Sequence, residues 1–144
     1  MEQQWVLPDT EDEDSAGFWE HTARHELVVE GCEDCDQLVW PPRPMCPNCR
    51  STRRRWVPVA GTGTVWSFVV PHPPLLPAFA ELAPYNVVVV ALDEDPGLRM
   101  VGNLVASDDG EINEIDPHSI EVGEPVSVVF HQIEDVTLPR WVRA

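Results

Sequence analysis

Four cysteines are the residues of this chain whose type and spacing most directly predict chemistry. Cys32 and Cys35 form one C-x2-C pair, and Cys46 and Cys49 form a second pair after ten intervening residues. Two such pairs can direct four thiolates to the corners of one tetrahedron, which suits zinc or a rubredoxin-like iron. A dithiol redox site would need only one pair. We therefore predict a structural metal site that binds Zn2+, with iron as the alternative metal.

No second set of residues predicts catalysis. When all four thiolates bind the metal, no cysteine remains as a nucleophile. The other nucleophiles and bases are scattered and lie in neither a G-x-S-x-G elbow nor a paired-carboxylate motif: Ser67, His72, His118 and His131. We predict no catalytic residue, and we expect that this chain is not an enzyme by itself.

The chain is strongly acidic, and all of its bases are arginine. Twenty-five acidic residues face nine arginines and no lysine, for a formal net charge of −16. The absence of lysine excludes Schiff-base chemistry, and the negative field disfavours a general nucleic-acid binder. Arg53, Arg54 and Arg55 crowd behind the second cysteine pair. They can offset the negative charge of a metal–thiolate site, bind phosphate groups or form a solvated basic face.

The elements that must position these residues are mostly strands. Short apolar segments lead into and out of the cysteine pairs, and about five strand-like segments with glycine turns follow after residue 59. This pattern predicts a mainly β protein that ends in a small closed barrel of the OB type, or alternatively of the SH3-like type. Residues 138–142 are interpreted as a tail. Four prolines in Pro71–Pro77 exclude regular structure there and predict an ordered apolar loop or a flexible flap.

The N-terminal part combines an acidic arm with a short helix. Residues 1–14 end in four consecutive acids and are expected to form a mobile arm. Ser15 can cap a helix that carries Phe18 and Trp19 on one side. The predicted division of the chain is an acidic arm and N-terminal helix at 1–27, a zinc ribbon at 28–58 and an OB-fold barrel at 59–144.

The order of these parts resembles a known family. A short aromatic helix precedes C-x2-C…P-R-P-x-C-P-x-C, followed by W-x-P-V-x-G-x-G-T-V-W-S-F, H-x-P…P-Y, a valine-rich strand and I-x-V-G-x-P-V-x-V-x-F. From about residue 15 to residue 142 the chain is similar to the acyl-CoA-associated zinc-ribbon/OB-fold family, long catalogued as a domain of unknown function. One departure is Asp36, at a position that is often glycine in such ribbons. Aspartate tolerates the positive φ expected there.

The resemblance implies an accessory subunit without chemistry of its own. Relatives associate with thiolase-like enzymes, in archaeal thiolase/hydroxymethylglutaryl-CoA synthase assemblies and in actinobacterial steroid side-chain aldolases. The implied partners are a thiolase-like subunit in a hetero-oligomer and the acyl-CoA substrate of the complex, without nucleic acid or membrane. Because the N-terminus lacks signal-peptide features, we expect a cytoplasmic protein. A nucleic-acid-binding zinc-ribbon/OB protein is the alternative.

Two groups of residues are candidates for contacts with acyl-CoA. The arginines behind the second cysteine pair are available to the CoA phosphates, and apolar residues of the flap are available to the acyl chain. The candidates for these contacts are Arg53, Arg54, Arg55, His72, Phe79 and Tyr85.

Four large aromatic residues are candidates for the partner interface. A ribbon of about 30 residues has little interior in which to bury them, and exposed aromatic patches often mark protein interfaces. These residues are Phe18, Trp19, Trp40 and Trp56. The alternative is that all four pack between the ribbon and the barrel.

Overall fold

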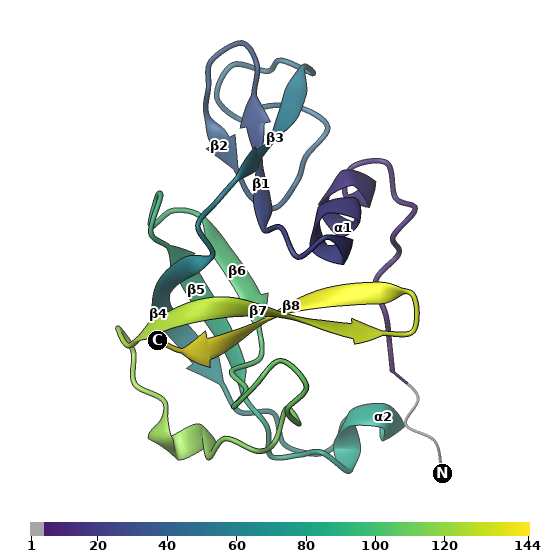
Figure 1. Cartoon of the computed structure of the whole chain (residues 1–144), viewed down its shortest axis with the longest axis vertical. Helices are drawn as coiled ribbons and strands as arrows, with labels where there is room; N and C mark the ends of the chain where they lie inside the picture. The colour runs from purple at the N-terminus through teal and green to yellow at the C-terminus, as the bar shows by residue number, and fades with distance from the viewer. Residues whose placement is uncertain (1–4) are drawn as a thin grey trace.

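The computed structural model describes residues 5–144 and shows a mainly β protein with two sheets. The three-stranded sheet and the α1 helix lie at one end of the long axis, and the five-stranded barrel forms the rest (Figure 1). The predicted fold class, a zinc ribbon followed by an OB-type barrel, is thereby confirmed.

The elements are α1 (Ala16–Ala23), β1 (Val28–Cys32), β2 (Leu38–Val39), β3 (Arg54–Pro58), β4 (Thr62–Val69), α2 (Pro77–Ala80), β5 (Val87–Leu92), β6 (Arg99–Gly102), the 3-10 helix η1 (Pro117–Ser119), β7 (Pro125–Ile133) and β8 (Val136–Arg143). Within the described residues, no helix is long and apolar enough to cross a membrane.

The three-stranded sheet, in the order β2–β1–β3, is the frame that carries the cysteines. β1 pairs antiparallel with β3, from Val28 opposite Pro58 to Cys32 opposite Arg54. Every residue of β1 is buried, including Glu30, so this strand is covered on both faces. Because β1 ends at Cys32, the sheet itself fixes the position of the first cysteine.

The five-stranded sheet closes on itself to form the barrel. Its antiparallel strands lie in the order β6–β5–β4–β7–β8. The Val105 N–H donates to the Trp141 carbonyl oxygen at 2.8 Å, and the Trp141 N–H donates to the Asn103 carbonyl oxygen at 3.0 Å. These bonds form a parallel bridge between the segment after β6 and β8. Residues 138–142, interpreted from the sequence as a tail, are therefore the central part of the strand that closes the barrel.

Two glycines at the start of β4 serve close strand packing. Gly61 has a positive φ of 78°, a conformation that glycine adopts without strain. A side chain at Gly63 would overlap the carbonyl oxygen of Ala91 on the neighbouring strand β5. The glycines of the G-T-G-T motif thus allow the strands to approach each other at the start of the barrel.

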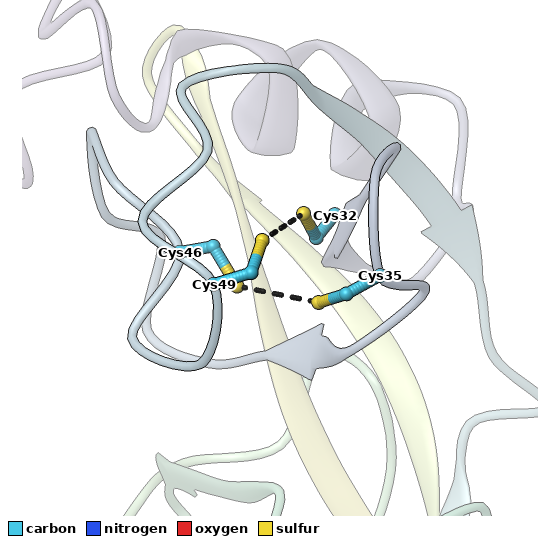
Figure 2. Close-up of side chains that lie close together, drawn as sticks. All are labelled: Cys32, Cys35, Cys46 and Cys49. Carbon is cyan, nitrogen blue, oxygen red and sulfur yellow. Dashed lines mark hydrogen bonds between the residues drawn. The ribbon is translucent and has the colours of Figure 1, made fainter.

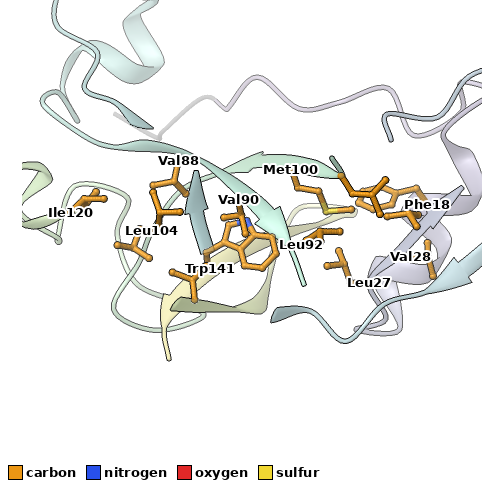
Figure 3. Packing of buried hydrophobic residues seen from close by; sticks show 14 residues of the cluster. Phe18, Leu27, Val28, Val88, Val90, Leu92, Met100, Leu104, Ile120 and Trp141 are labelled. Carbon is orange, nitrogen blue, oxygen red and sulfur yellow. The ribbon is translucent and has the colours of Figure 1, made fainter. Parts of the chain in front are cut away.

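One hydrophobic core connects the barrel with the helix and the ribbon. In Figure 3 the buried side chains run from Ile120, through Trp141 and Val90 in the barrel, to Leu27 and Phe18 near the ribbon. All five are at most 5% exposed. Because they form one cluster, the helix, the ribbon and the barrel hold one another in place.

Residues 5–14, expected from the sequence to be a mobile arm, pack along the rest of the protein. The ring of Trp5 lies edge-on against Phe79, with 5.9 Å between the ring centroids. Asp14 accepts a hydrogen bond at 3.1 Å from the Arg54 guanidinium. Both partners are distant in the sequence, so the local acidic composition could not reveal these contacts.

The α1 helix lies directly against the ribbon at Gly17. It begins after Ser15 as predicted, although the Ser15 side chain makes no capping hydrogen bond, and it ends at Ala23. A methyl group on Gly17 would overlap the indole ring of Trp56 at Nε1. The helix can therefore approach the ribbon this closely only because residue 17 lacks a side chain.

We expect Gly17→Ala to destabilise the protein although alanine favours helix formation. Overpacking against Trp56 should cost about 1–3 kcal/mol, more than the ~1 kcal/mol that alanine gains over glycine in a helix. Urea denaturation measures the change in unfolding free energy. Glu20→Ala, at an exposed position of the same helix, is the control and should have little effect. A Gly17→Ala variant more stable than the parent would show that the indole is not held against the helix.

Candidate metal centre

The first cysteine pair lies in a tight turn that follows β1. The Asp36 N–H donates to the Cys32 carbonyl oxygen at 3.0 Å, and the Cys32 N–H donates to the Gln37 carbonyl oxygen at 3.0 Å. Asp36 has a positive φ of 62°, as expected from its place after the first pair. These bonds hold the turn so that Cys32 and Cys35 face the same side.

The second cysteine pair repeats the same turn. The Arg50 N–H donates to the Cys46 carbonyl oxygen at 2.9 Å, and the Cys46 N–H donates to the Ser51 carbonyl oxygen at 2.8 Å. Arg50 has a φ of 66° and so occupies the position that corresponds to Asp36. Sequence reasoning identified only the first of these two positions, although the repeated C-x2-C spacing was the signal for both.

The four sulfur atoms converge between the two turns, as predicted (Figure 2). The Cys32 and Cys49 Sγ atoms lie 3.5 Å apart, and the Cys35 and Cys46 Sγ atoms lie 3.7 Å apart. All four lie within 4.8 Å of one another. A tetrahedral zinc with Zn–S bonds of about 2.3 Å has sulfur atoms about 3.8 Å apart. The donor set therefore fits a tetrahedral metal ion whose coordination the four sulfurs complete, which leaves no position for a substrate.

Two of the thiols have pKa values shifted in opposite directions. The Asn48 side-chain amide donates to the Cys35 Sγ at 3.4 Å and, with a backbone N–H, lowers the pKa of Cys35 from 9.0 to about 6. The Ser51 N–H lowers the pKa of Cys49, but the neighbouring thiols, with Cys32 first, and burial together raise it to about 12. The Cys35 thiolate thus forms readily, whereas the neighbouring thiols oppose the ionisation of Cys49. A divalent cation supplies the positive charge that lets all four ionise.

Two of the predicted arginines bind carboxylates of the first turn. The Arg55 Nη2 lies 2.9 Å from a carboxylate oxygen of Asp36, and its Nη1 donates to the Cys32 carbonyl oxygen at 3.0 Å. The Arg53 Nη2 lies 3.4 Å from a Glu33 carboxylate oxygen. Within residues 5–144 no arginine donates to a cysteine sulfur. These arginines therefore support the backbone around the metal centre and pair with its acidic side chains.

The third arginine neutralises a buried carboxylate. Glu30, in the middle of β1, is 3% exposed and accepts hydrogen bonds from Arg54 Nη1 at 3.0 Å and from the Arg43 backbone N–H at 3.2 Å. The same guanidinium binds Asp14, so it joins the N-terminal segment to the ribbon. Sequence reasoning missed this pair, although one acid in the apolar strand Val28–Cys32 was a signal for a buried partner.

The flap residues lie at the other end of the molecule. Phe79 and Tyr85 pack together with 6.0 Å between ring centroids. The His72 Nδ1 donates to the Val70 carbonyl oxygen at 2.8 Å. Figure 1 shows α2, which contains Phe79, at the end of the long axis opposite the ribbon. The structure thus brings the flap aromatics together but separates them from the arginines near the metal centre.

The four aromatic residues predicted for the partner interface are buried to different depths. Phe18 is 3% exposed and belongs to the core, so the exposed aromatic patch is smaller than the sequence predicts. Its ring lies 4.9 Å from Trp19 and 4.7 Å from Trp40, measured between centroids. Trp19, Trp40 and Trp56 are half-buried. Phe18, Trp19 and Trp40 line an apolar cleft of about 540 Å³, bounded by the N-terminal segment, α1, the ribbon, β6 and β8.

The two parts of the chain match two family descriptions. The rubredoxin-like zinc ribbon domain of ChsH2 matches residues 19–53. The C-terminal OB-fold domain of ChsH2 matches residues 56–131, more than half of the chain. The order of the matched domains is the order of ribbon and barrel in the structure.

Curated relatives are of two kinds. A probable enoyl-CoA hydratase alpha subunit of Thermomonospora curvata is 39% identical over 127 residues, which are 88% of this chain and 36% of that protein. The 3-oxo-4,17-pregnadiene-20-carboxyl-CoA hydratase alpha subunit of Mycobacterium tuberculosis is 33% identical over 89% of this chain and 37% of its own length. The chain thus spans little more than a third of these two relatives. A DUF35 domain-containing scaffold protein of Methanothermobacter thermautotrophicus is 31% identical over 81% of each chain.

A solved structure extends the similarity to three dimensions. A chain of the Ltp2-ChsH2(DUF35) aldolase superposes with a TM-score of 0.79 and is 36% identical in sequence. The match covers 94% of the present chain and 98% of the aldolase chain. A DUF35-family protein of Sulfolobus solfataricus, with 11% identity and a TM-score of 0.59, shares the fold.

Proposed function

Because this chain belongs to the ChsH2/DUF35 family of zinc-ribbon and OB-fold proteins, we propose that it is a non-catalytic subunit that binds a thiolase-like partner and helps form an acyl-CoA-processing complex. The observation that carries this proposal is the 36% identity over 98% of a chain in the Ltp2-ChsH2(DUF35) aldolase. We favour an aldolase of the kind that degrades steroid side chains. A thiolase/hydroxymethylglutaryl-CoA synthase type of assembly is the second form of this proposal.

The chemistry of the metal centre supports a non-catalytic role. Four sulfur ligands close the coordination of a tetrahedral ion, so it has no open position with which to activate a carbonyl or a water. We infer that the ion is zinc and that it holds the ribbon in shape. The bond-making groups for acyl-CoA would then belong to the partner.

The flap is our proposed contact for the acyl part of the substrate. His72, Phe79 and Tyr85 lie on the segment that bears α2, away from the metal centre. Two of the three arginines predicted to bind CoA phosphates are engaged with acids of this chain: Arg54 and Arg55 lie 3.0 Å and 2.9 Å from carboxylate oxygens. Binding a phosphate or a nucleic-acid backbone would require breaking these pairs. We therefore assign Arg54 and Arg55 to the stability of the ribbon. Arg53, whose contacts with the exposed acids Glu33 and Asp34 are 3.4 and 3.6 Å long, remains our candidate for a CoA phosphate.

The aromatic cleft is our proposed partner interface. Interface cores are enriched in tryptophan and other aromatic residues, and a few such side chains supply most of the binding free energy. Trp19 and Trp40 line the cleft and keep part of their rings exposed, whereas Phe18 forms part of its buried wall. We propose that a side chain of the partner enters the cleft between the two indoles.

We expect Trp19→Ser to weaken partner binding about 30-fold or more, as for a hot-spot residue. The dissociation constant is measured by calorimetry well below the melting temperature of each variant, together with its zinc content. The matched control is Trp66→Ser, which removes an indole that is 49% exposed on β4 and should change affinity less than threefold. The reverse result, with Trp66→Ser weakening binding and Trp19→Ser not, would place the interface on the outer face of the barrel.

Reconstitution tests the function itself. The purified chain should show no turnover of acyl-CoA thioesters, and adding a thiolase-like partner should produce both a stable complex in size-exclusion chromatography and cleavage of the substrate. Substituting the nucleophile of the partner should abolish that cleavage. Turnover by the purified chain alone would contradict the non-catalytic assignment. Failure to form a complex would contradict the proposal that the partner is a thiolase-like protein.

A further inference from the structure

The barrel closes through one short stretch of pairing between β8 and the segment after β6. Within residues 5–144 this pairing consists of one parallel bridge, between Leu104 and Trp141, and the Trp141 N–H donates to the Asn103 carbonyl oxygen at 3.0 Å. The next bond of this ladder would run from the N–H of residue 139 to the carbonyl oxygen of residue 101. Residue 139 is a proline, Pro139, which has no N–H. The pairing therefore ends there, and β6 keeps a free edge.

Main-chain groups on this free edge of β6 have no partner among residues 5–144. The Leu92 N–H donates to the Leu98 carbonyl oxygen at 2.9 Å, so the even-numbered residues of β6 are those that bond to β5 in this antiparallel pair. The N–H and carbonyl groups of Val101 therefore point away from β5, and no loop or bridge bond reaches them. Val101 is also 65% exposed. An exposed strand edge of this kind is a template on which a further strand can pair.

The free edge borders the apolar cleft of about 540 Å³. Residues 100–103 line one side of the cleft and residues 138–140 line the other, and Phe18, Trp19 and Trp40 contribute their aromatic rings. In an extended segment that pairs with β6, successive side chains point to opposite faces. One set of alternate side chains can therefore enter the cleft while the main chain bonds to β6.

The rim of the cleft is acidic. Asp9 and Asp12 line it, and both are exposed. Within residues 5–144 their carboxylates accept only backbone N–H groups two residues further along and form no ion pair. Arg140 also lines the cleft, but it is buried and donates to the Gly110 carbonyl oxygen. The exposed rim therefore attracts a basic side chain. A second copy of this chain would bring a further net charge of −16 and no lysine, so a segment of a different subunit suits the rim better.

We propose that the cleft binds an extended segment of the partner subunit, which pairs with β6 as an additional strand. An apolar side chain of this segment lies among Phe18, Trp19 and Trp40, and a lysine or arginine of the segment lies at Asp9 and Asp12. In such strand addition the main-chain hydrogen bonds provide affinity and the alternating side chains provide specificity. This inference rests on the partner binding proposed above, and it states which kind of partner segment the cleft takes.

Two variants at residue 101 of the full chain separate main-chain pairing from side-chain contact. The probe is purified Ltp2, the first-named component of the Ltp2-ChsH2(DUF35) aldolase, and calorimetry measures its affinity. Val101→Pro removes an N–H that strand addition needs but that takes no part in pairing with β5, so the edge strand should tolerate it. Val101→Ala, the matched control, removes the exposed side chain and keeps the N–H. We expect Val101→Pro to weaken binding at least tenfold and Val101→Ala less than threefold.

Amide hydrogen exchange of the parent protein, read by NMR, tests the same bond without a substitution. In the free chain the Val101 N–H should exchange fast, whereas the Met100 N–H, which bonds to β5, should exchange slowly. Binding of Ltp2 should slow exchange at Val101 at least tenfold and change it little at Met100. Should Val101→Pro not fold, this measurement decides.

A pair of double variants tests the acidic rim. Asp9→Asn with Asp12→Asn should weaken Ltp2 binding about fivefold at low salt, a typical effect of two exposed charges. Glu11→Gln with Glu13→Gln removes the same charge from exposed positions outside the cleft lining and should change the affinity less than twofold. Equal effects of the two double variants would show that the general charge of the chain acts, and not the rim.

The outcomes distinguish this inference from the proposed function. If the parent binds Ltp2 but Val101→Pro binds as tightly as Val101→Ala, and exchange at Val101 does not slow, strand addition is wrong and the partner remains correct. Failure of the parent to bind Ltp2 would contradict both. Protection of the Val101 N–H that rises with the concentration of the free chain would identify a second copy as the occupant, and would also overturn the proposal.

Discussion

Replacing Cys46 with alanine is expected to unfold the ribbon and to abolish metal binding. Structural zinc in such ribbons contributes on the order of 10 kcal/mol of apparent binding free energy, which is comparable to the whole stability of a small domain. Cys46 is also 5% exposed and anchors the second turn through its backbone. Because Leu27 and Val28 join the ribbon to the barrel core, the barrel should lose stability as well.

Metal analysis and circular dichroism measure this effect. The parent protein should contain one zinc per chain, and Cys46→Ala should contain none and show a lower melting temperature. Met45→Ala, at the preceding position and 49% exposed, is the matched control and should keep its zinc. Metal affinity should fall as the pH falls, because binding converts thiols into thiolates and releases protons. Folded parent protein without stoichiometric zinc or iron would overturn the assignment of the site.

Replacing Trp141 with alanine is expected to cost about 3–5 kcal/mol of unfolding free energy. Trp141 is 0% exposed and is the largest of the fully buried side chains. Its backbone forms the two hydrogen bonds that close the barrel, and these remain possible in the alanine variant. The loss therefore reports on the packing of the indole in the core, and at about 2–4 °C per kcal/mol the melting temperature should fall by about 10 °C.

Trp66→Ala is the matched control for this prediction. Trp66 is 49% exposed on the outer face of β4, where the Arg99 guanidinium lies 3.7 Å from its ring centroid. An exposed cation–π contact contributes about 0.5–1 kcal/mol, so the control should lose no more than about 1 kcal/mol. Urea denaturation of both variants provides the comparison. Equal losses at the two positions would mean that Trp141 is not the centre of the barrel core.

The four-cysteine cluster is the part of this protein that sequence reasoning predicts best. Each C-x2-C turn is built within six residues, from Cys32 to Gln37 and from Cys46 to Ser51, so its geometry follows from local sequence. The strand pattern and glycine turns likewise predicted a mainly β fold, since strand formation depends on short alternating or apolar segments. The order of ribbon and barrel could be recognised because both parts are marked by such short sequence patterns.

The surroundings of that centre could not be predicted from the sequence. The arginine cluster left charge compensation, phosphate binding and a solvated face open, and the sequence could not reveal that Arg54 pairs with Glu30 and Asp14, which lie 24 and 40 residues away. Phe18 suggested an exposed contact, yet it is buried beside Trp40. In each case the partner comes from another element, and only folding decides which side chains meet.

The sequence by itself therefore determined the four-cysteine cluster and the succession of ribbon and barrel. Only the tertiary structure decided that residues 138–142 close the barrel and that the flap lies opposite the four cysteines. The physical reason is the range of the interactions. Cysteine turns depend on hydrogen bonds between near neighbours, whereas burial and charge pairing depend on how distant segments pack around one core.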